Sequence, residues 1–103
     1  MDVNTRIQTI LEQNHVVLFM KGTPDFPQCG FSGRAVQLLH HCGVPFFHVN
    51  IFEDPELREA LKVYSNWPTY PQLYVNGELV GGCDIMMDLF EQGELQTTLQ
   101  ASN

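Results

Sequence analysis

Residues 15–43 read HVVLFMKGTPDFPQCGFSGRAVQLLHHCG, and this stretch decides the fold. It opens with a nearly unbroken apolar run, which is typical of a central strand that is covered on both faces. Two of the chain's six prolines and one glycine follow within 22–28, so this segment is predicted to be a loop. A helix should then start near Cys29 or Gly30, and Gly43 is placed to end it with a left-handed cap. Cys29 is thus expected at the N-terminus of a helix.

The spacing of apolar residues indicates which helix faces are buried. Asp2 can cap a first helix that runs to Asn14. In the helix after Cys29, the expected core-facing stripe consists of Phe31, Ala35, Leu38, Leu39 and Cys42. Asp54 and Pro55 have the cap and first-residue pattern that opens another helix. Its inward-facing residues should be Leu57, Ala60, Leu61 and Tyr64.

Three further strands are predicted. Residues 45–51 form the second strand, because apolar positions alternate along this segment. Residues 72–75 and 78–81 flank Asn76-Gly77, which is the strongest short-range signal for a β-hairpin. The last two strands should therefore pair antiparallel through a tight turn.

The C-terminal part of the chain is predicted to be helical. Asp84 can cap a helix that runs through Phe90, and Gly93 separates this helix from a final amphipathic piece. The order of elements is then helix, β-α-β, helix, β-β, helix. A right-handed parallel βαβ unit followed by an antiparallel hairpin, with helices on both faces of four strands, is the thioredoxin-like arrangement. We predict an α/β chain of this fold, with a four-stranded mixed sheet and with 1–103 as a single domain.

Composition and charge limit the class of partner. A chain of 103 residues can bury one core, and its 44% hydrophobic residues are typical of a globular protein. A net charge of -7 would repel nucleic acid and anionic membranes, and no segment approaches the roughly 18 apolar residues of a membrane span. Three cysteines without regular spacing favour a reducing compartment over a secreted disulfide framework. We expect the cytoplasm, or an organelle after removal of a transit peptide.

Cys29 is the strongest candidate for a functional residue. The free N–H groups and the dipole of a helix N-terminus stabilise an anion, and the cation of Lys21 follows the first strand. Such a setting lowers a thiol pKa from about 8.5 to roughly 3.5 to 7.5, so we expect a reactive thiolate at neutral pH. Arg58 and Lys62, four residues apart, share one helix face and bring further positive charge together.

The segment CGFS, 29–32, resembles the active-site motif of monothiol glutaredoxins. Three more segments are similar to motifs of that family, in its order and spacing: KGTP at 21–24, WPTYPQ at 67–72 and GGCD at 81–84. Together these motifs cover nearly the whole chain, which resembles the single-domain kind. The resemblance implies a glutaredoxin fold, glutathione as the ligand and Cys29 as the catalytic residue.

The resemblance also implies how glutathione would be held. Lys21 and Arg58 would bind its glycine carboxylate through charge-assisted hydrogen bonds, and Lys62 could add to them. The main chain of Tyr70 would pair with the tripeptide like an added strand, next to a cis peptide bond to Pro71.

At the other end of the ligand, the main chain of Cys83 and the side chain of Asp84 would hold the γ-glutamyl group at a helix start. Each of these residues also has a plainer explanation. Lysine and arginine are usually solvated surface, Asp84 could be only a cap, and Trp67 with Pro68 could be only packing. Their joint occurrence in the order of the family favours the ligand.

The other two cysteines are weaker candidates. Dithiol relatives carry a second cysteine where this chain has Ser32, so no disulfide can form within the motif. Cys42 lies on the same helix as Cys29 at a distance of about 20 Å, and we expect it to be an inert core residue. Cys83 either forms a disulfide with Cys29 under oxidation or matters only through its backbone N–H.

An iron–sulfur cluster normally needs four thiolates, and this chain has one well-placed cysteine. Two chains that each give Cys29, together with two glutathione thiolates, make four, which is the bridging 2Fe-2S arrangement known for the proteins that this chain resembles. The resemblance therefore implies a homodimer bridged by the cluster. The four histidines have no ligand spacing, so they are not expected to bind metal by themselves. A BolA-like partner protein could supply a histidine ligand.

Three functions remain open. The resemblance favours a carrier that acts in iron–sulfur cluster assembly, in transfer to acceptor proteins and in iron sensing. The alternative is an enzyme, a glutathione-dependent thiol-disulfide oxidoreductase that removes glutathione from proteins through Cys29, an activity that is generally weak in the family. A regulatory interaction module without a cofactor would explain the fold but not the motifs.

Overall fold

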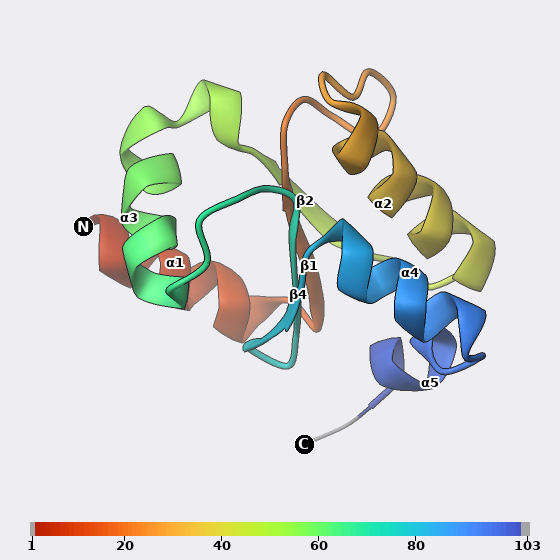
Figure 1. Ribbon diagram of the computed structural model, residues 1–103. Coiled ribbons are helices and arrows are strands. Elements are labelled where there is room, and N and C mark those ends of the chain that lie inside the picture. The colour runs from red at the N-terminus through yellow and green to blue at the C-terminus, as the bar shows by residue number, and fades with distance from the viewer. Residues whose placement is uncertain (1, 102–103) are drawn as a thin grey trace.

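The structure of the chain is a computed structural model that describes residues 2–101 (Figure 1). At its centre lies one four-stranded sheet with the strand order β2-β1-β3-β4. The strands are β1 (Val16–Met20), β2 (Phe47–Asn50), β3 (Gln72–Val75) and β4 (Glu78–Gly81). β1 pairs parallel with β2 and antiparallel with β3, and β3 pairs antiparallel with β4. The predicted mixed sheet is confirmed.

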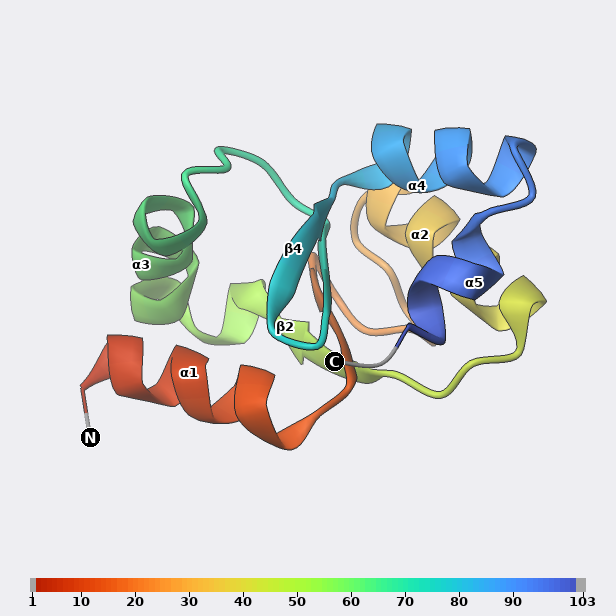
Figure 2. The same ribbon diagram turned by 90° about the horizontal axis from the view of Figure 1, so that it is seen from below.

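Helices cover both faces of this sheet. They are α1 (Val3–Gln13), α2 (Gly30–Cys42), α3 (Pro55–Ser65), α4 (Cys83–Glu91) and α5 (Leu95–Leu99), and a short 3-10 helix, η1 (Ile51–Glu53), follows β2. Figures 1 and 2 show α1 and α3 on one face and α2, α4 and α5 on the other. This is the thioredoxin-like arrangement that the sequence predicts. Within the described residues, none of the helices has the length and apolar character needed to cross a membrane.

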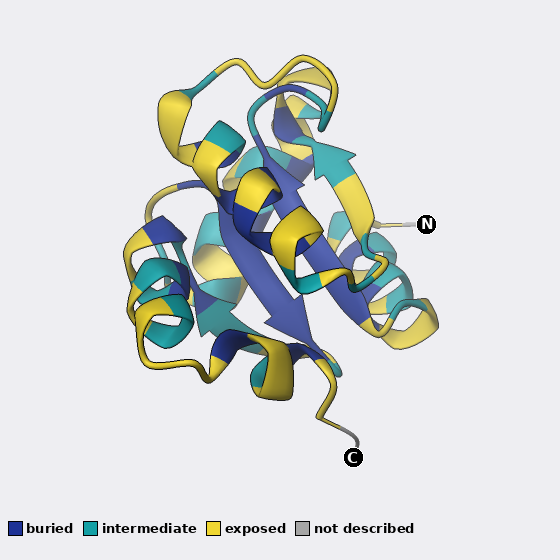
Figure 3. Ribbon diagram, turned by 90° about the vertical axis from the view of Figure 1, so that its right-hand side faces the viewer, coloured by how far each residue is buried: buried dark blue, intermediate teal, exposed yellow. Residues whose placement is uncertain are grey.

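β1 is the buried centre of the molecule, and all five of its residues are buried (Figure 3). On one face, residues such as Leu18 and Leu39 join the sheet to α2, α4 and α5 in one apolar cluster. On the other face, Phe19 and Leu61 belong to a second cluster that includes α1 and α3. Each large apolar side chain that is fully buried contributes roughly 1.5–3 kcal/mol, so the two clusters hold the sheet between its helices.

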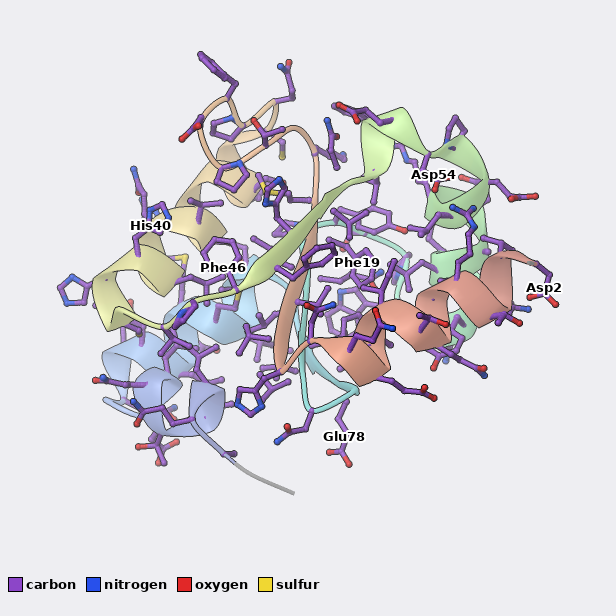
Figure 4. The ribbon with its side chains drawn as sticks, turned by 180° about the vertical axis from the view of Figure 1, so that it is seen from behind. Asp2, Phe19, His40, Phe46, Asp54 and Glu78 are labelled. Atoms are coloured by element: carbon purple, nitrogen blue, oxygen red, sulfur yellow. The ribbon has the colours of Figure 1, made fainter. Side chains whose placement is uncertain are left out.

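Two helix N-termini are capped as predicted. Asp2 accepts a hydrogen bond from the N–H of Thr5 at 2.7 Å, and Asp54 accepts one from the N–H of Leu57 at 3.2 Å. Arg6 of α1 also contacts the carboxylate of Asp54 at 2.7 Å, so α1 is joined to the start of α3, where Figure 4 labels Asp54. The hydrogen bond from Arg6 holds the pKa of Asp54 below its usual range.

Two turns also follow the prediction. Asn76 and Gly77 have φ values of 54° and 79°, and a type I′ hairpin turn requires positive φ at both of these positions. Gly43 has a φ of 69° and ends α2 in the left-handed region. The hairpin and the length of α2 are therefore set by residues that the sequence identifies directly.

Two aromatic residues that were expected in the core are exposed. Phe31 is 63% exposed and Tyr64 is 42% exposed, although Leu57 and Leu61 on the predicted face of α3 are buried. Both aromatic residues lie in terminal turns, Phe31 at the start of α2 and Tyr64 at the end of α3. Apolar spacing predicts the direction of a side chain around the helix, but it does not show whether neighbouring elements reach far enough to cover a terminal turn.

Two predicted element boundaries are wrong. The second strand was predicted over 45–51 but runs from Phe47 to Asn50. Ile51 begins η1, because the side chain of Asn50 accepts a hydrogen bond from the N–H of Phe52 and turns the chain. Asp84 is not a cap, since the N-cap of α4 is Gly82, which has no side chain to offer. Asp84 lies instead in the first turn of α4, where a carboxylate is favoured by the helix dipole.

Candidate functional site

A cleft of about 480 Å³ opens where the end of β1, the first turn of α2, the loop before β3 and the start of α4 come together. α2 and the start of α4 lie side by side on one face of the sheet (Figure 1). Five of the residues expected at the functional site line this cleft: Lys21, Cys29, Tyr70, Cys83 and Asp84. Segments that are far apart in the sequence thus form one concave surface.

Cys29 is the N-cap of α2, and its side chain is only partly buried. The pKa of Cys29 lies below the ordinary value of a thiol, chiefly because the backbone N–H of Ser32 stabilises the thiolate. The backbone N–H of Phe31, the charge of Lys21 and the hydroxyl of Ser32 act in the same direction, whereas partial burial opposes them. The start of the helix therefore favours the thiolate, as the sequence predicts.

Ser32 has a structural contact that the sequence does not reveal. Its side chain is fully buried, and its Oγ accepts a hydrogen bond from the main-chain N–H of Lys21 at 3.0 Å. This bond joins the end of β1 to the first turn of α2. It fixes the main chain of Lys21 beside the helix that carries Cys29.

The loop between β1 and α2 is held by main-chain hydrogen bonds and by a bond to a side chain of β2. The N–H of Gln28 donates to the carbonyl of Lys21 at 2.9 Å, and the N–H of Gly22 donates to Oδ1 of Asn50 at 3.0 Å. Gly22 has a φ of 92°, and a Cβ at this position would lie 2.6 Å from main-chain atoms of Phe26 and Gln28. The tight loop therefore requires glycine at this position.

The opposite wall of the cleft comes from the loop before β3 and from α4. Tyr70 is buried, and its hydroxyl donates to the carbonyl of Arg58 at 2.7 Å, which ties the loop to α3. The peptide bond between Tyr70 and Pro71 is cis, as expected. Cys83 and Asp84 are the first residues of α4, and no side chain caps this helix. Its first N–H groups thus lack a side-chain partner at the edge of the cleft.

Arg58 and Lys62 do not line the cleft. The guanidinium of Arg58 lies 5.4 Å from the centre of the Phe52 ring, and Nζ of Lys62 pairs with Glu59 at 3.0 Å. The two positive charges expected on α3, those of Arg58 and Lys62, therefore make their contacts outside the cleft. Within the lining, the positive charge comes from Lys21.

The three cysteines are free and differ in character. Burial raises the pKa of Cys83, and the charge of Asp84 adds to this effect. Burial also raises the pKa of Cys42, which lies at the far end of α2 and packs against the core, as predicted. Cys29 is thus the cysteine whose surroundings favour a thiolate.

The indole of Trp67 is part of the lining, and the sequence reasoning gave it no role beyond its motif. Among the described residues, its Nε1 is a buried side-chain nitrogen without a hydrogen-bond partner. A Cβ on Gly82 would lie 3.5 Å from this atom and 3.3 Å from the carbonyl oxygen of Pro71, so the wall is closely packed. The exposed ring of Phe31 also lines the cleft, and its place in the CGFS motif was the available signal.

Three of the four histidines have structural contacts. The two ring nitrogens of His15 lie 2.6 Å from Oδ1 of Asn76 and 2.8 Å from the carbonyl of Leu99, so His15 links β1 to the hairpin and to α5. His40 and His41 contact the rings of Phe46 and Phe90, respectively. Within residues 2–101, no group of three or more His, Cys, Asp or Glu side chains is placed to hold a metal ion.

Comparison with known proteins identifies the family. A family model described as Glutaredoxin matches residues 16–80. Glutaredoxin 4 of Pasteurella multocida is 54% identical over 99 residues, which cover 96% of this chain and 91% of that protein. Probable monothiol glutaredoxin 2 of Rickettsia typhi is 55% identical over 94 residues, which cover 91% of this chain and 85% of that protein. The solution structure of reduced poplar apo GrxS14 has a TM-score of 0.83 and 51% identity, and the match covers 95% of this chain and 90% of that one. With its CGFS motif at the start of α2, the chain belongs to the glutaredoxin family and resembles the monothiol members of that family.

Proposed function

We propose that the chain acts as a single glutaredoxin domain that binds glutathione in this cleft and, as a homodimer, carries a bridging 2Fe-2S cluster. The observation that carries the proposal is the setting of Cys29, a cleft residue whose thiolate is favoured and whose neighbour one turn away is Ser32 rather than a second thiol. The role would be cluster assembly, transfer to acceptor proteins and iron sensing. The compartment would be the cytoplasm, or an organelle after removal of a transit peptide.

The polar groups around the cleft suit the charged ends of glutathione. Lys21 offers a cation to the glycine carboxylate, and the main chain of Tyr70 can pair with the tripeptide. The N–H groups at Cys83 and at the start of α4, which no side chain caps, suit the γ-glutamyl carboxylate, while the carboxylate of Asp84 suits the ammonium group. Arg58 would join the glycine site only after its guanidinium leaves the ring that it covers.

The donor count supports a cluster shared between chains. A 2Fe-2S cluster takes four thiolate ligands, and each chain offers Cys29 in the cleft. Cys83 is buried and its pKa is raised, so it is a poor ligand by comparison. Two Cys29 thiolates and two glutathione thiolates would complete the set. A BolA-like partner would take the place of one chain and supply a histidine ligand.

The experiment is anaerobic reconstitution with iron, sulfide and glutathione, followed by visible absorption spectroscopy. Wild-type protein should show the charge-transfer bands of a 2Fe-2S cluster, and Cys29→Ser should lose them because its thiolate is gone. Cys42→Ser is the matched control and should keep them, since Cys42 lies at the opposite end of α2. A full cluster on Cys29→Ser, or a full cluster without glutathione, would show that the proposed ligand set is wrong.

A second candidate function rests on the same thiolate. In a protein deglutathionylase, the sulfur of Cys29 attacks the glutathione sulfur of a mixed disulfide and releases the protein thiolate. A second glutathione thiolate then attacks the Cys29–glutathione disulfide, which frees Cys29 and yields oxidised glutathione. The partly exposed sulfur and lowered pKa of Cys29 favour the first step. Rapid turnover of a glutathionylated peptide by a protein that binds no cluster would place this function first.

A further inference from the structure

One buried side chain lies beneath the loop before β3. Gln72, the first residue of β3, is fully buried. Its Nε2 donates to the carbonyl of Trp67 at 3.0 Å and to the carbonyl of Thr69 at 3.2 Å. These carbonyls belong to a segment without helix or strand pairing. The side-chain amide of Gln72 thus supplies these two carbonyls with the hydrogen bonds that a helix or strand would otherwise provide.

Tyr74 sets the orientation of this amide. Its hydroxyl donates to Oε1 of Gln72 at 3.1 Å in a buried hydrogen bond. Burial raises the pKa of Tyr74 to about 12, so the hydroxyl keeps its proton at neutral pH. The ring of Tyr74 packs edge-on against Phe19, with 5.5 Å between ring centres, and Phe19 lies in the middle of the core (Figure 4). The two loop carbonyls can only accept hydrogen bonds, so Nε2 faces them and Oε1 faces the hydroxyl of Tyr74.

The loop is held at Trp67 from two sides. The main-chain N–H of Trp67 donates to Oγ of Ser65 at 3.1 Å and to the carbonyl of Lys62 at 3.3 Å. Its carbonyl accepts from Gln72, so both polar groups of the main chain of Trp67 are engaged. Because the main chain of Trp67 is held in place, its indole is held where it lines the cleft and packs against Gly82. A shift of the loop would therefore displace one wall of the cleft.

We propose that Gln72 is a positioning residue for the cleft and that Tyr74 orients its amide. Gln72 does not line the cleft, and it acts by holding the loop that presents Trp67 and the main chain of Tyr70. The inference rests on the proposed function, in which this wall binds glutathione. Glutamate would place an oxygen against two carbonyl oxygens, and asparagine is one methylene too short to keep both contacts, so glutamine is specifically required.

The fluorescence of Trp67 provides a direct test, because Trp67 is the only tryptophan in the chain. Acrylamide quenching of Gln72→Glu without ligand should exceed that of wild type. Titration with glutathione should show about tenfold weaker binding if the binding-competent fraction of the loop falls to about one tenth. Tyr74→Phe keeps both Nε2 donors but leaves the buried Oε1 of Gln72 without its donor, so it should show the same changes to a smaller extent. It also serves as the second variant if Gln72→Glu does not fold.

Leu95→Ala is the control for lost stability, since Leu95 belongs to α5 and to the apolar cluster on the opposite face of the sheet. At a temperature where it is folded, it should retain wild-type quenching and wild-type glutathione affinity. Unchanged quenching in both Gln72→Glu and Tyr74→Phe, or an equal loss of affinity in Leu95→Ala, would overturn the inference. If wild-type protein binds no glutathione, the proposed function fails, and the quenching comparison still decides whether Gln72 holds the loop.

Discussion

Replacing Ser32 by alanine separates the two ways in which this residue acts on the site. The hydroxyl of Ser32 accepts a hydrogen bond from the main-chain N–H of Lys21 at 3.0 Å, and Ser32→Ala removes that acceptor. The backbone N–H of Ser32 is the main cause of the lowered pKa of Cys29, and alanine keeps this N–H. Ser32→Ala should therefore reduce stability while leaving most of the effect on the pKa of Cys29.

The size of the stability loss follows from the burial of the bond. A buried donor left without a partner costs about 1–3 kcal/mol, and the bond from Lys21 to Ser32 is only partly buried, so the cost lies near the lower end. Alanine has a higher helix propensity than serine in α2, which offsets a few tenths of a kcal/mol. We expect a net loss of about 0.5–1 kcal/mol. In a domain of this size, that corresponds to a fall in Tm of roughly 2–8 °C.

Two measurements check this prediction. Thermal unfolding gives the change in Tm, and the pH dependence of the alkylation rate of Cys29 gives its pKa. Because the thiolate is the reactive form, a lowered pKa moves the plateau of the rate to lower pH than that of a free thiol, whose pKa is about 8.5. The profile of Ser32→Ala should remain close to that of wild type. An unchanged Tm, or a Cys29 that titrates near about pH 8.5 in Ser32→Ala, would refute the assignment of these two roles.

Three further substitutions at the cleft and in the loop beside it have expected outcomes. Ser32→Cys should form a disulfide with Cys29 one turn away, detected as a loss of free thiols on mild oxidation, and its cluster retention should then fall. Lys21→Ala should weaken glutathione binding measured by calorimetry by about 1.5–3 kcal/mol, because a hydrogen bond to a charged group is lost, whereas Arg58→Ala should have a smaller effect. Gly22→Ala should lower Tm, because a Cβ at a φ of 92° meets main-chain atoms at 2.6 Å.

Each of these has an opposite outcome that would contradict it. Unchanged free thiols in Ser32→Cys after oxidation would show that the residue does not face Cys29. A larger loss of glutathione affinity in Arg58→Ala than in Lys21→Ala would show that the guanidinium of Arg58 enters the cleft when the ligand binds. A wild-type Tm for Gly22→Ala would show that the loop tolerates a side chain there.

Much of the fold can be predicted because the conformation that each short segment prefers is the one that it adopts in the folded chain. Asn76 and Gly77 require the hairpin turn that the structure contains, and Gly43 ends α2 because only a residue tolerant of positive φ suits that position. The apolar run of β1 predicts a strand that is covered on both faces, and all five residues of β1 are buried. Cys29 could be placed at a helix start because a proline-rich loop precedes it and a helical pattern follows it.

The remaining features depend on contacts between distant segments, which no local pattern contains. The bonds from Gln72 to the loop before β3 depend on how the chain folds over the start of a strand. The exposure of Phe31 depends on where the neighbouring elements end, and the position of Arg58 depends on the ring of Phe52. Asp84 had the residue type of a cap, but Gly82 occupies the cap position because β4 ends just before it.

In the proposed assembly, one Cys29 and one glutathione from each side hold a cluster between two chains, and native mass spectrometry of the anaerobically reconstituted protein detects this assembly by its intact mass. We expect a species with the mass of two chains, one 2Fe-2S cluster and two glutathione molecules, and we expect that Cys29→Ser does not form this species. A cluster-bearing monomer, or a cluster-bearing dimer without glutathione, would show that the cluster is not held by one Cys29 and one glutathione from each chain.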